Sequence, residues 1–249
     1  MKLQHILTIS ALLLGLFSCA TNKNSYLDIQ DQKAREIIEK SIEAYGGLDN
    51  WNNKNQLSFK KWFILYDAEG KEEINVHQKH SYSTEKIYMS WMDGNDKIEQ
   101  TKVGKKYQKS RNGKLDESAT QTSIQNSVLA ATFVMNFPYN LLDKGSSISY
   151  DGHTTFEGKE VDIIRVEYFP ETQKHHTTKD IWWHYIDKKT YIGLGYKVKH
   201  KDHISLVKNT SFHTFNGFTL PWKRASYRVD EDGNELFLRA TYEYTDYSE

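Results

Sequence analysis

The clearest pattern of apolar and polar positions lies in residues 31–51, DQKAREIIEKSIEAYGGLDNW. A helix drawn through this stretch has charged side chains on one face. The opposite face carries small or apolar residues at helical spacing: Ala34, Ile37, Ile38, Ser41, Ile42 and Tyr45. Gly46 and Gly47 follow, and glycine ends helices because it enters the left-handed conformation without a Cβ clash. The pattern predicts an amphipathic helix over residues 34–45.

After Trp51 the chain shows the patterns of β-strands, separated by turn motifs rich in Gly, Asn and Asp. A polar hairpin at residues 96–111, around Gly104, is expected at a sheet edge because both of its faces are weakly apolar. Asp151-Gly152 is expected at a hairpin tip. Other strands are expected at residues 56–66, 74–83, 86–92, 147–150, 161–169, 180–186, 195–201, 204–214, 218–229 and 235–247.

Residues 122–142 interrupt this series of strands. Apolar side chains recur at helical spacing over residues 124–135. The sequence Phe137-Pro138-Tyr139 then ends or kinks the helix, because proline lacks the N–H that a helix interior needs. The sequence therefore predicts two helices in all.

Regularly spaced turns are typical of a meandering antiparallel sheet, and a long sheet of this kind closes or curls. Its concave apolar face needs a cover, and the two helices are the available elements. The predicted fold class is mainly β (α+β): a single curled antiparallel sheet, or half-open β-barrel, with two helices covering the concave face. No internal repeat or proline-rich linker divides residues 31–249, so one domain is expected there.

Composition and charge exclude several classes. Hydrophobic residues make up 38% of the 249 positions and only three are proline, as in a folded protein with a sizeable core. The 33 basic and 33 acidic residues balance. Because no net field attracts nucleic acid, we do not expect nucleic-acid binding.

The first residues have the features of an export signal. Residues 6–17, ILTISALLLGLF, are too short to span a bilayer but suit a signal peptide. They run into Leu16-Phe17-Ser18-Cys19, which resembles the lipobox of bacterial lipoproteins. The resemblance implies cleavage before Cys19 and acylation of this residue, the only cysteine in the chain. Residues 1–18 would be the signal peptide and residues 19–30 a lipidated, flexible tether.

The alternative is an ordinary secreted protein with an unmodified cysteine. If Cys19 is acylated, its chains anchor the protein to a membrane. Ala20 and Thr21 follow it, without the aspartate that suggests inner-membrane retention in enteric lipoproteins. This favours the outer membrane and leaves open whether the domain faces the periplasm or the outside.

Metal chemistry is not expected, although the chain has ten histidines. Zinc needs three or four converging ligands, and each candidate pair supplies at most two. These pairs are His200 with His203, His175 with His176, and His77 with His80. No cofactor is expected either.

Enzymatic activity has little support in the sequence. The chain lacks a G-x-S-x-G nucleophile motif. A small hydrolase would use a buried acid or histidine, for which Asp180, His184 and Asp187 are the candidates.

Large apolar side chains on elements expected to meet are the best candidates for a binding site. They are Trp62, Phe63, Leu65, Met89, Trp91, Phe133, Met135, Trp183 and Tyr185. Two interpretations remain open: an ordinary filled core, or a partly open cavity that accepts a hydrophobic ligand.

Three motifs resemble a known family. They are Ala44-Tyr45-Gly46-Gly47 followed by Trp51, the run Phe137-Pro138-Tyr139-Asn140-Leu141-Leu142-Asp143, and Gly217-Phe218-Thr219-Leu220-Pro221. Together with the lipobox and the meander, they resemble the LolA/LolB-like outer-membrane lipoprotein-sorting fold and similar envelope lipoproteins. The resemblance implies a half-barrel that cradles acyl chains or another amphiphile.

The leading functional hypothesis is therefore a lipid-anchored cell-envelope protein that binds an acyl chain, lipid or lipoprotein. It would act as carrier, receptor or chaperone, without covalent chemistry, and we expect a monomer. One alternative is a structural or interaction lipoprotein with a filled barrel that binds an envelope protein. The other is the small hydrolase.

Overall fold

The thirteen strands of the described residues form one antiparallel sheet in the computed structural model, which describes residues 26–169 and 179–249. The strands are β1 (Gln56–Tyr66), β2 (Glu72–Ser83), β3 (Lys86–Asp93), β4 (Asp96–Val103), β5 (Lys106–Arg111), β6 (Lys114–Leu115), β7 (Ser146–Phe156), β8 (Lys159–Tyr168), β9 (Ile181–Asp187), β10 (Gly193–Lys199), β11 (Ile204–Phe215), β12 (Phe218–Val229) and β13 (Glu235–Ser248). The helices are α1 (Gln32–Ala44), α2 (Leu48–Asn53) and α3 (Gln121–Met135), with short 3-10 turns η1 (Tyr26–Asp28) and η2 (Tyr139–Leu142).

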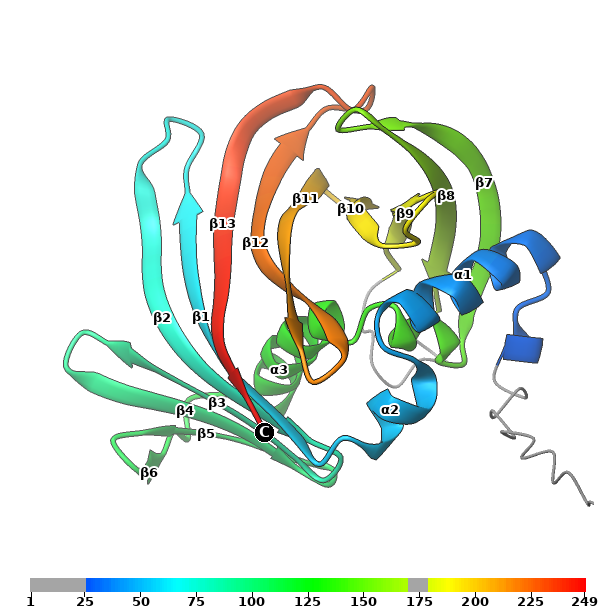
Figure 1. Cartoon of the computed structure of the whole chain (residues 1–249). Coiled ribbons are helices and arrows are strands. Elements are labelled where there is room, and N and C mark those ends of the chain that lie inside the picture. Colours follow the sequence, from blue (N-terminus) through cyan, green and yellow to red (C-terminus); the bar gives the residue numbers. More distant parts are fainter. Residues whose placement is uncertain (1–25, 170–178) are drawn as a thin grey trace, which may run out of the picture.

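The order of strands in the sheet is β6-β5-β4-β3-β2-β1-β13-β12-β11-β10-β9-β8-β7. The first strand thus lies in the middle, paired with the last. The chain runs outward to β6, crosses through α3 and η2 to the other edge at β7, and returns strand by strand. The sheet curls strongly and its two edge strands do not pair (Figure 1). This confirms the predicted half-open sheet.

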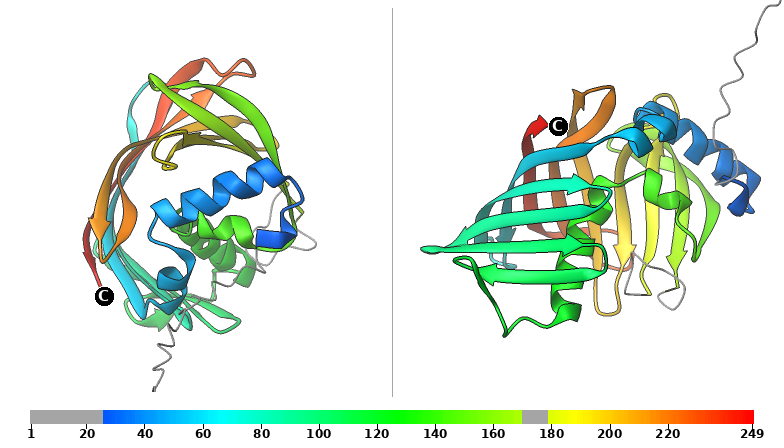
Figure 2. Two further views of the ribbon diagram at one scale, coloured as in Figure 1. Left: turned by 45° about the vertical axis from the view of Figure 1, so that its right-hand side comes forward. Right: turned by 90° about the horizontal axis from the view of Figure 1, so that it is seen from below.

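Helix α1 confirms the first predicted helix and its buried face. Asp31 caps it, since one carboxylate oxygen accepts from the Ala34 N–H at 3.0 Å. The other oxygen accepts from the Tyr150 N–H of β7 at 2.9 Å, which ties the start of the helix to the sheet edge. The predicted apolar positions Ala34, Ile37, Ile38, Ser41 and Ile42 are all buried. The helix lies within the curl of the sheet (Figure 2, left).

The three motifs that carry the family resemblance meet at one place, which we call the motif junction: Tyr45, Gly46, Trp51, Tyr139 and Phe218. Trp51, on the unpredicted helix α2, stacks on Tyr139 at 4.3 Å between ring centroids and meets the Phe218 ring edge-on at 5.5 Å. The Tyr139 hydroxyl donates to the Tyr45 carbonyl at 2.9 Å. Gly46 has φ +117°, and a Cβ there would lie 2.7 Å from the carbonyl oxygen of Gly217. These motifs are therefore a packing junction where α1 turns into α2.

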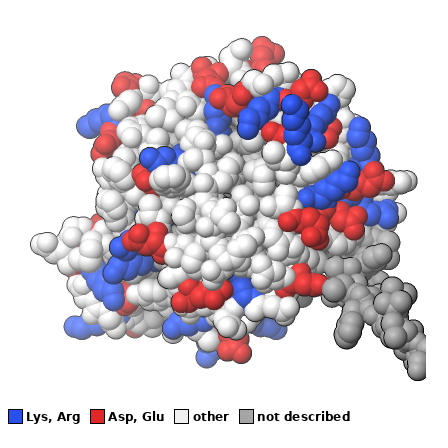
Figure 3. Space-filling model, viewed as in Figure 1, with Lys and Arg blue, Asp and Glu red and all other residues white. Residues whose placement is uncertain are grey.

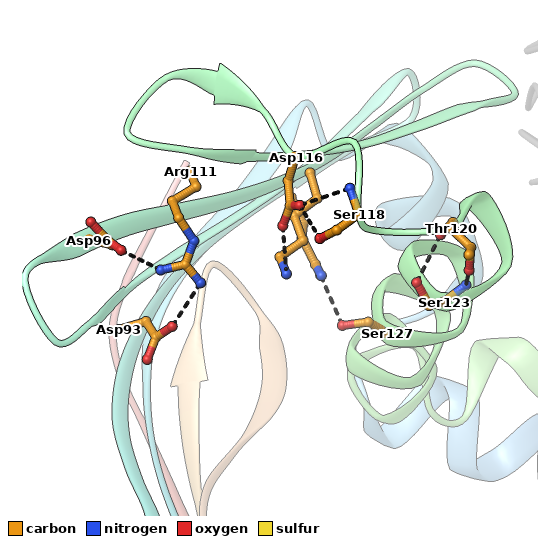
Figure 4. Close-up of polar contacts among 10 residues, drawn as sticks. Asp93, Asp96, Arg111, Asp116, Ser118, Thr120, Ser123 and Ser127 are labelled. Carbon is orange, nitrogen blue, oxygen red and sulfur yellow. Dashed lines mark hydrogen bonds and ion pairs between the residues drawn. The ribbon is translucent and has the colours of Figure 1, made fainter.

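Helix α3 crosses between the two edges and is tied to the β3–β5 part of the sheet. Its N-cap Thr120 accepts from the Ser123 N–H, and Ser127 donates to the Gln100 side chain at 2.8 Å (Figure 4). Nearby, Arg111 pairs with Asp93 and Asp96, which holds the hairpins together (Figure 4). A small cluster of Tyr107, Ile124 and Val128 packs the first half of the helix onto β5.

The polar hairpin is at the sheet edge, as predicted, in strands β4 and β5. The turn at Asp151-Gly152 was wrongly placed. Strand β7 continues through it as a bulge, with a register shift between Tyr150 and His153. The hairpin turns at Glu157-Gly158 instead, where both residues have positive φ (47° and 72°), the geometry of a tight two-residue turn.

The main core lies between α1 and the covered face of the sheet. Side chains of α1 pack there with Leu57, Phe59, Met89, Ile164 and Trp182 from strands on both halves. Within residues 26–169 and 179–249, no helix has the length and apolar character to cross a membrane. Cys19 and the pair His175-His176 lie outside the described residues.

Candidate ligand-binding cavity

A cavity of about 490 Å³, counting its open mouth, lies between the C-terminal part of α3 and the sheet. It is lined by Tyr45, Phe133, Val134, Phe137, Trp182, His184, Gly193, Gly195, Tyr196, Asn209, Phe212, Pro221 and Arg224. The lining is mostly apolar and aromatic, with a few polar groups, as in small-molecule sites. Figure 3 shows the molecule from the open side of the curled sheet. Within the described part of the chain, the centre of this surface carries no Lys, Arg, Asp or Glu, and these residues lie around it.

Aromatic rings make up the walls of the cavity. Phe133 on α3 contacts Trp182 on β9 at 4.9 Å between centroids. Phe137, in the turn after α3, stacks on His184 at 4.8 Å, and Trp182 contacts Tyr196 at 4.8 Å. Such ring pairs contribute about 0.5–1.5 kcal/mol beyond their burial, so the walls hold their shape without a ligand.

Two glycines on β10 allow close packing, Gly193 against the cavity wall and Gly195 against the separate cluster around Phe156. A Cβ on Gly193 would lie 2.7 Å from the Phe137 ring, and a Cβ on Gly195 would clash with the Val207 carbonyl and the Phe156 ring. The Gly193 N–H donates to the Tyr45 hydroxyl at 3.2 Å, and its carbonyl accepts from Asn209 at 2.7 Å. The end of α1 is thereby attached to the cavity wall.

Among the described residues that line the cavity, Arg224 on β12 is the one that carries a charge, and it is only 4% exposed. Its Nε donates to Asn209 Oδ1 at 2.9 Å, Nη2 to the Tyr196 hydroxyl at 2.9 Å and Nη1 to the Tyr244 hydroxyl at 3.3 Å. Burial lowers the pKa of the guanidinium, but these tyrosines and Tyr242 outweigh it and the pKa is raised. Arg224 is therefore a buried permanent cation.

Lys61, on β1, lies on the other side of Tyr242 from Arg224. The Lys61 ammonium is 5.4 Å from the centre of the Tyr242 ring, and the Arg224 guanidinium carbon is 5.6 Å from it. Burial and the charge of Arg224 lower the pKa of Lys61 to about 8. Near neutral pH, two positive charges therefore share this part of the covered face.

Two buried histidines on the same face are neutral. Burial lowers the pKa of His184 to about 3, and burial with the charge of Lys61 does the same for His80. His80 is hydrogen-bonded to Tyr82 at 2.8 Å and stacks on Phe59 at 4.8 Å. His184 Nε2 has no hydrogen-bond partner within the described part of the chain. Neither ring contributes a charge to the site near pH 7.

Of the nine apolar candidates, Met89, Trp91, Phe133 and Met135 lie in the main core or against it. Only Phe133 among the nine also lines the cavity. Phe63 and Leu65 follow Leu57 and Phe59 along the same face of β1, and Phe63 stacks on Tyr242 at 5.2 Å.

The other three candidates lie elsewhere. Trp62 points to the opposite face of β1, is 40% exposed and donates to Asn75. Trp183 donates to Asp151, and Tyr185 packs in a separate small cluster with Phe156. Successive strand residues point to opposite faces, so Trp182 and His184 take the cavity face of β9.

The hydrolase candidates do not converge on one site. Asp180 contacts His200 at 3.1 Å, and Asp187 accepts from the N–H groups of Lys189 and Thr190 in a turn. His184 is enclosed by aromatic rings. In the described ranges, no three His, Cys, Asp or Glu side chains are grouped to hold a metal ion.

Sequence reasoning missed Arg224, Lys61, Tyr196 and Asn209. One signal was available. Arg224 is an even number of residues from Phe218, Leu220 and Ser226 in the same strand, and these three residues are buried. A charged residue in the phase of a buried face marks a functional candidate.

The fold defined by this sheet and its helices occurs in solved structures. A LolA superfamily protein from Nitrosomonas europaea is similar with a TM-score of 0.53 and 9% identity, covering 86% of this chain and 92% of that one. An outer membrane lipoprotein-sorting protein domain from Vibrio parahaemolyticus gives a TM-score of 0.51 and 10% identity, covering 87% and 92%. The fold is thus LolA-like, as predicted.

Residues 12–203 match the model of a family of unknown function, DUF6503, and the chain belongs to this family. Among curated proteins, none matches significantly.

Proposed function

We propose that this protein binds an apolar or amphiphilic molecule in the cavity between α3 and the sheet, as a carrier, receptor or chaperone. The observation that carries the proposal is a cavity with aromatic walls whose lining includes one buried charged group, Arg224. Apolar burial supplies affinity at about 25 cal/mol per Å², so no covalent chemistry is needed.

The location follows from the same proposal. Acylation of Cys19 would attach the domain to the cell envelope, with the outer membrane favoured by the residues that follow it. The similarity to an outer membrane lipoprotein-sorting domain from Vibrio parahaemolyticus supports a ligand that carries acyl chains, and the apolar lining of the cavity supports the same ligand class.

A neutral fluorescent probe tests the proposal. N-phenyl-1-naphthylamine brightens in apolar surroundings, and we expect saturable binding with one site per chain. The protein is the chain from residue 19 with Cys19→Ser, which carries no acyl group and keeps every described residue. The variant Val134→Trp places a large side chain into the cavity and is expected to weaken binding at least tenfold.

The matched control is Ala130→Trp, one turn earlier on the exposed side of α3. It adds the same side chain to the same helix outside the cavity lining, and its affinity should stay within about twofold of the parent. Absent or unsaturable probe binding, or equal loss in the two variants, would contradict the proposal.

A further inference from the structure

We propose that the ligand is an anionic amphiphile whose acidic head group is bound by Arg224, with its apolar chain between the aromatic walls. This inference rests on the binding function proposed above and specifies its substrate class. Three features support it: the hydrogen bonds of Arg224, the hydroxyl groups around it and the second cation beside it.

Arg224 has hydrogen-bond donors to spare. A guanidinium carries five N–H groups in a planar fork. Three hydrogen bonds use one N–H each on Nε, Nη1 and Nη2. Within the described residues, one N–H on Nη1 and one on Nη2 therefore remain for another acceptor. These N–H groups can donate to the oxygens of a carboxylate or a phosphate, with which arginine forms strong charge-assisted hydrogen bonds.

The partners of Arg224 add donors rather than acceptors. The hydroxyl oxygens of Tyr196 and Tyr244 accept from the guanidinium, so each hydroxyl proton is left to donate. Neither hydroxyl donates to any acceptor among the described residues, whereas Asn209 uses its amide group on Gly193. Among the described residues, the groups bonded to Arg224 therefore offer hydroxyl donors, which match the oxygens of an anion.

In the part of the chain that the structure describes, no carboxylate neutralises the two cations. Arg224 bonds only neutral groups, and Lys61 contacts only the rings of Phe63 and Tyr242, within residues 26–169 and 179–249. The charge of Arg224 also disfavours the charged form of Lys61. A buried cation without a counter-ion is costly. A bound anion removes this cost, because it supplies the missing negative charge.

A purely structural role accounts for less of this arrangement. Arg224 does join β12 to β10, β11 and β13 through Tyr196, Asn209 and Tyr244. A neutral glutamine or an additional tyrosine would serve the same purpose without burying a charge. The charge, its two unused N–H groups and its place in the lining of an apolar cavity together point to a head-group site.

Isothermal titration calorimetry with chain-matched ligands tests the proposal. The ligands are dodecanoate and monododecyl phosphate, used below their critical micelle concentrations, and 1-dodecanol, used below its solubility limit, all at pH 7, with inorganic phosphate and acetate as free anions. We expect the two anionic dodecyl ligands to bind at least tenfold more tightly than dodecanol. The free anions should bind far more weakly than either, because they lack the chain that fills the cavity.

The variant Arg224→Gln should lose at least tenfold in affinity for both anionic ligands and keep its affinity for dodecanol within about twofold. Lys223→Gln is the matched control, since it removes the same charge from the adjacent, exposed position, and its affinities should not change. If Arg224→Gln does not fold, the comparison of dodecanoate with dodecanol on the parent chain decides alone.

Equal affinity of the parent chain for dodecanoate and dodecanol would overturn the head-group site while leaving the binding function intact. Free phosphate binding as tightly as dodecyl phosphate would also overturn it, since the acyl chain would then contribute nothing. Failure of every dodecyl ligand, together with failure of the naphthylamine probe, would refute the binding function itself.

Discussion

At the scale of single residues, the covered face of the sheet carries ionisable side chains in unusual states. His80 and His184 are each 3% exposed, and their pKa values are lowered to about 3. The unfolded chain binds a proton at each histidine below about pH 6.5, whereas the folded protein does not until about pH 3. Stability therefore falls as the pH falls through this window.

This linkage predicts the effect of His184→Phe. Between pH 7 and pH 5, each buried histidine costs roughly 2 kcal/mol of unfolding free energy, because only the unfolded state takes up the proton. Between pH 7 and pH 5, the free energy of unfolding of the variant should therefore fall by about 2 kcal/mol less than that of the parent. Chemical denaturation at both pH values measures the difference. His77→Gln, at an exposed position, should behave as the parent does, and an equal loss in parent and His184→Phe would contradict the account.

At the scale of elements, the motif junction fixes where α1 turns into α2. Gly46 and Gly47 both have positive φ, +117° and +84°. A Cβ at Gly46 would meet the Gly217 carbonyl at 2.7 Å and the Phe218 ring at 2.9 Å. A Cβ at Gly47 would have only Glu43 Oε2 nearby, at 3.7 Å. A side chain at either position would strain the backbone, but only a side chain at Gly46 would also clash with neighbouring atoms.

The pair predicts different losses of stability. Gly47→Ala should cost about 1–2 kcal/mol, the strain of a side chain in the left-handed region. Gly46→Ala should cost roughly 1–3 kcal/mol more, because β12 and α1 must also move apart. Denaturant unfolding of both variants measures the costs, and equal values would show that the junction is not tightly packed.

The elements also show which features the sequence can specify. Helix α1 was predictable because its stripe, its Asp31 cap and its glycine stop are local signals. The edge hairpin was predictable from its two polar faces. Helix α2 was not predictable, because its six residues are too few to show a helical repeat of apolar positions. The face of the sheet to which Trp183 points was also not predictable. Trp182 and Trp183 are adjacent aromatic residues, so the alternation of apolar and polar positions does not show which of the two is on the covered face.

The cavity depends on pairing between distant segments. Arg224 lies opposite Asn209 and Tyr242, and both pairings of its strand contain bulges, one after Asn209 on β11 and one at Arg239 on β13. Each bulge shifts which residues face the helices, so strand periodicity alone does not place Arg224 beside Tyr196. The LolA-like fold could be recognised from motifs, whereas the polar floor of the cavity required the register of the whole sheet.

At the scale of the whole molecule, the curled sheet encloses α1 in its filled part and leaves a cavity beside α3. The two interpretations of the aromatic side chains thus apply to different regions. Met89 and Met135 belong to a packed core, both 2% exposed, while Phe133 faces open space with Trp182. The central claim is that this space holds a molecule.

Native mass spectrometry of the chain from residue 19 with Cys19→Ser tests that claim most directly. We expect a protein carrying one discrete added mass of an amphiphile, which is lost on solvent extraction and regained when dodecanoate is supplied. The accurate mass would name the ligand class. A clean unliganded mass that persists when lipids are supplied would contradict the account, and the protein would then be a filled half-barrel whose partners are other proteins.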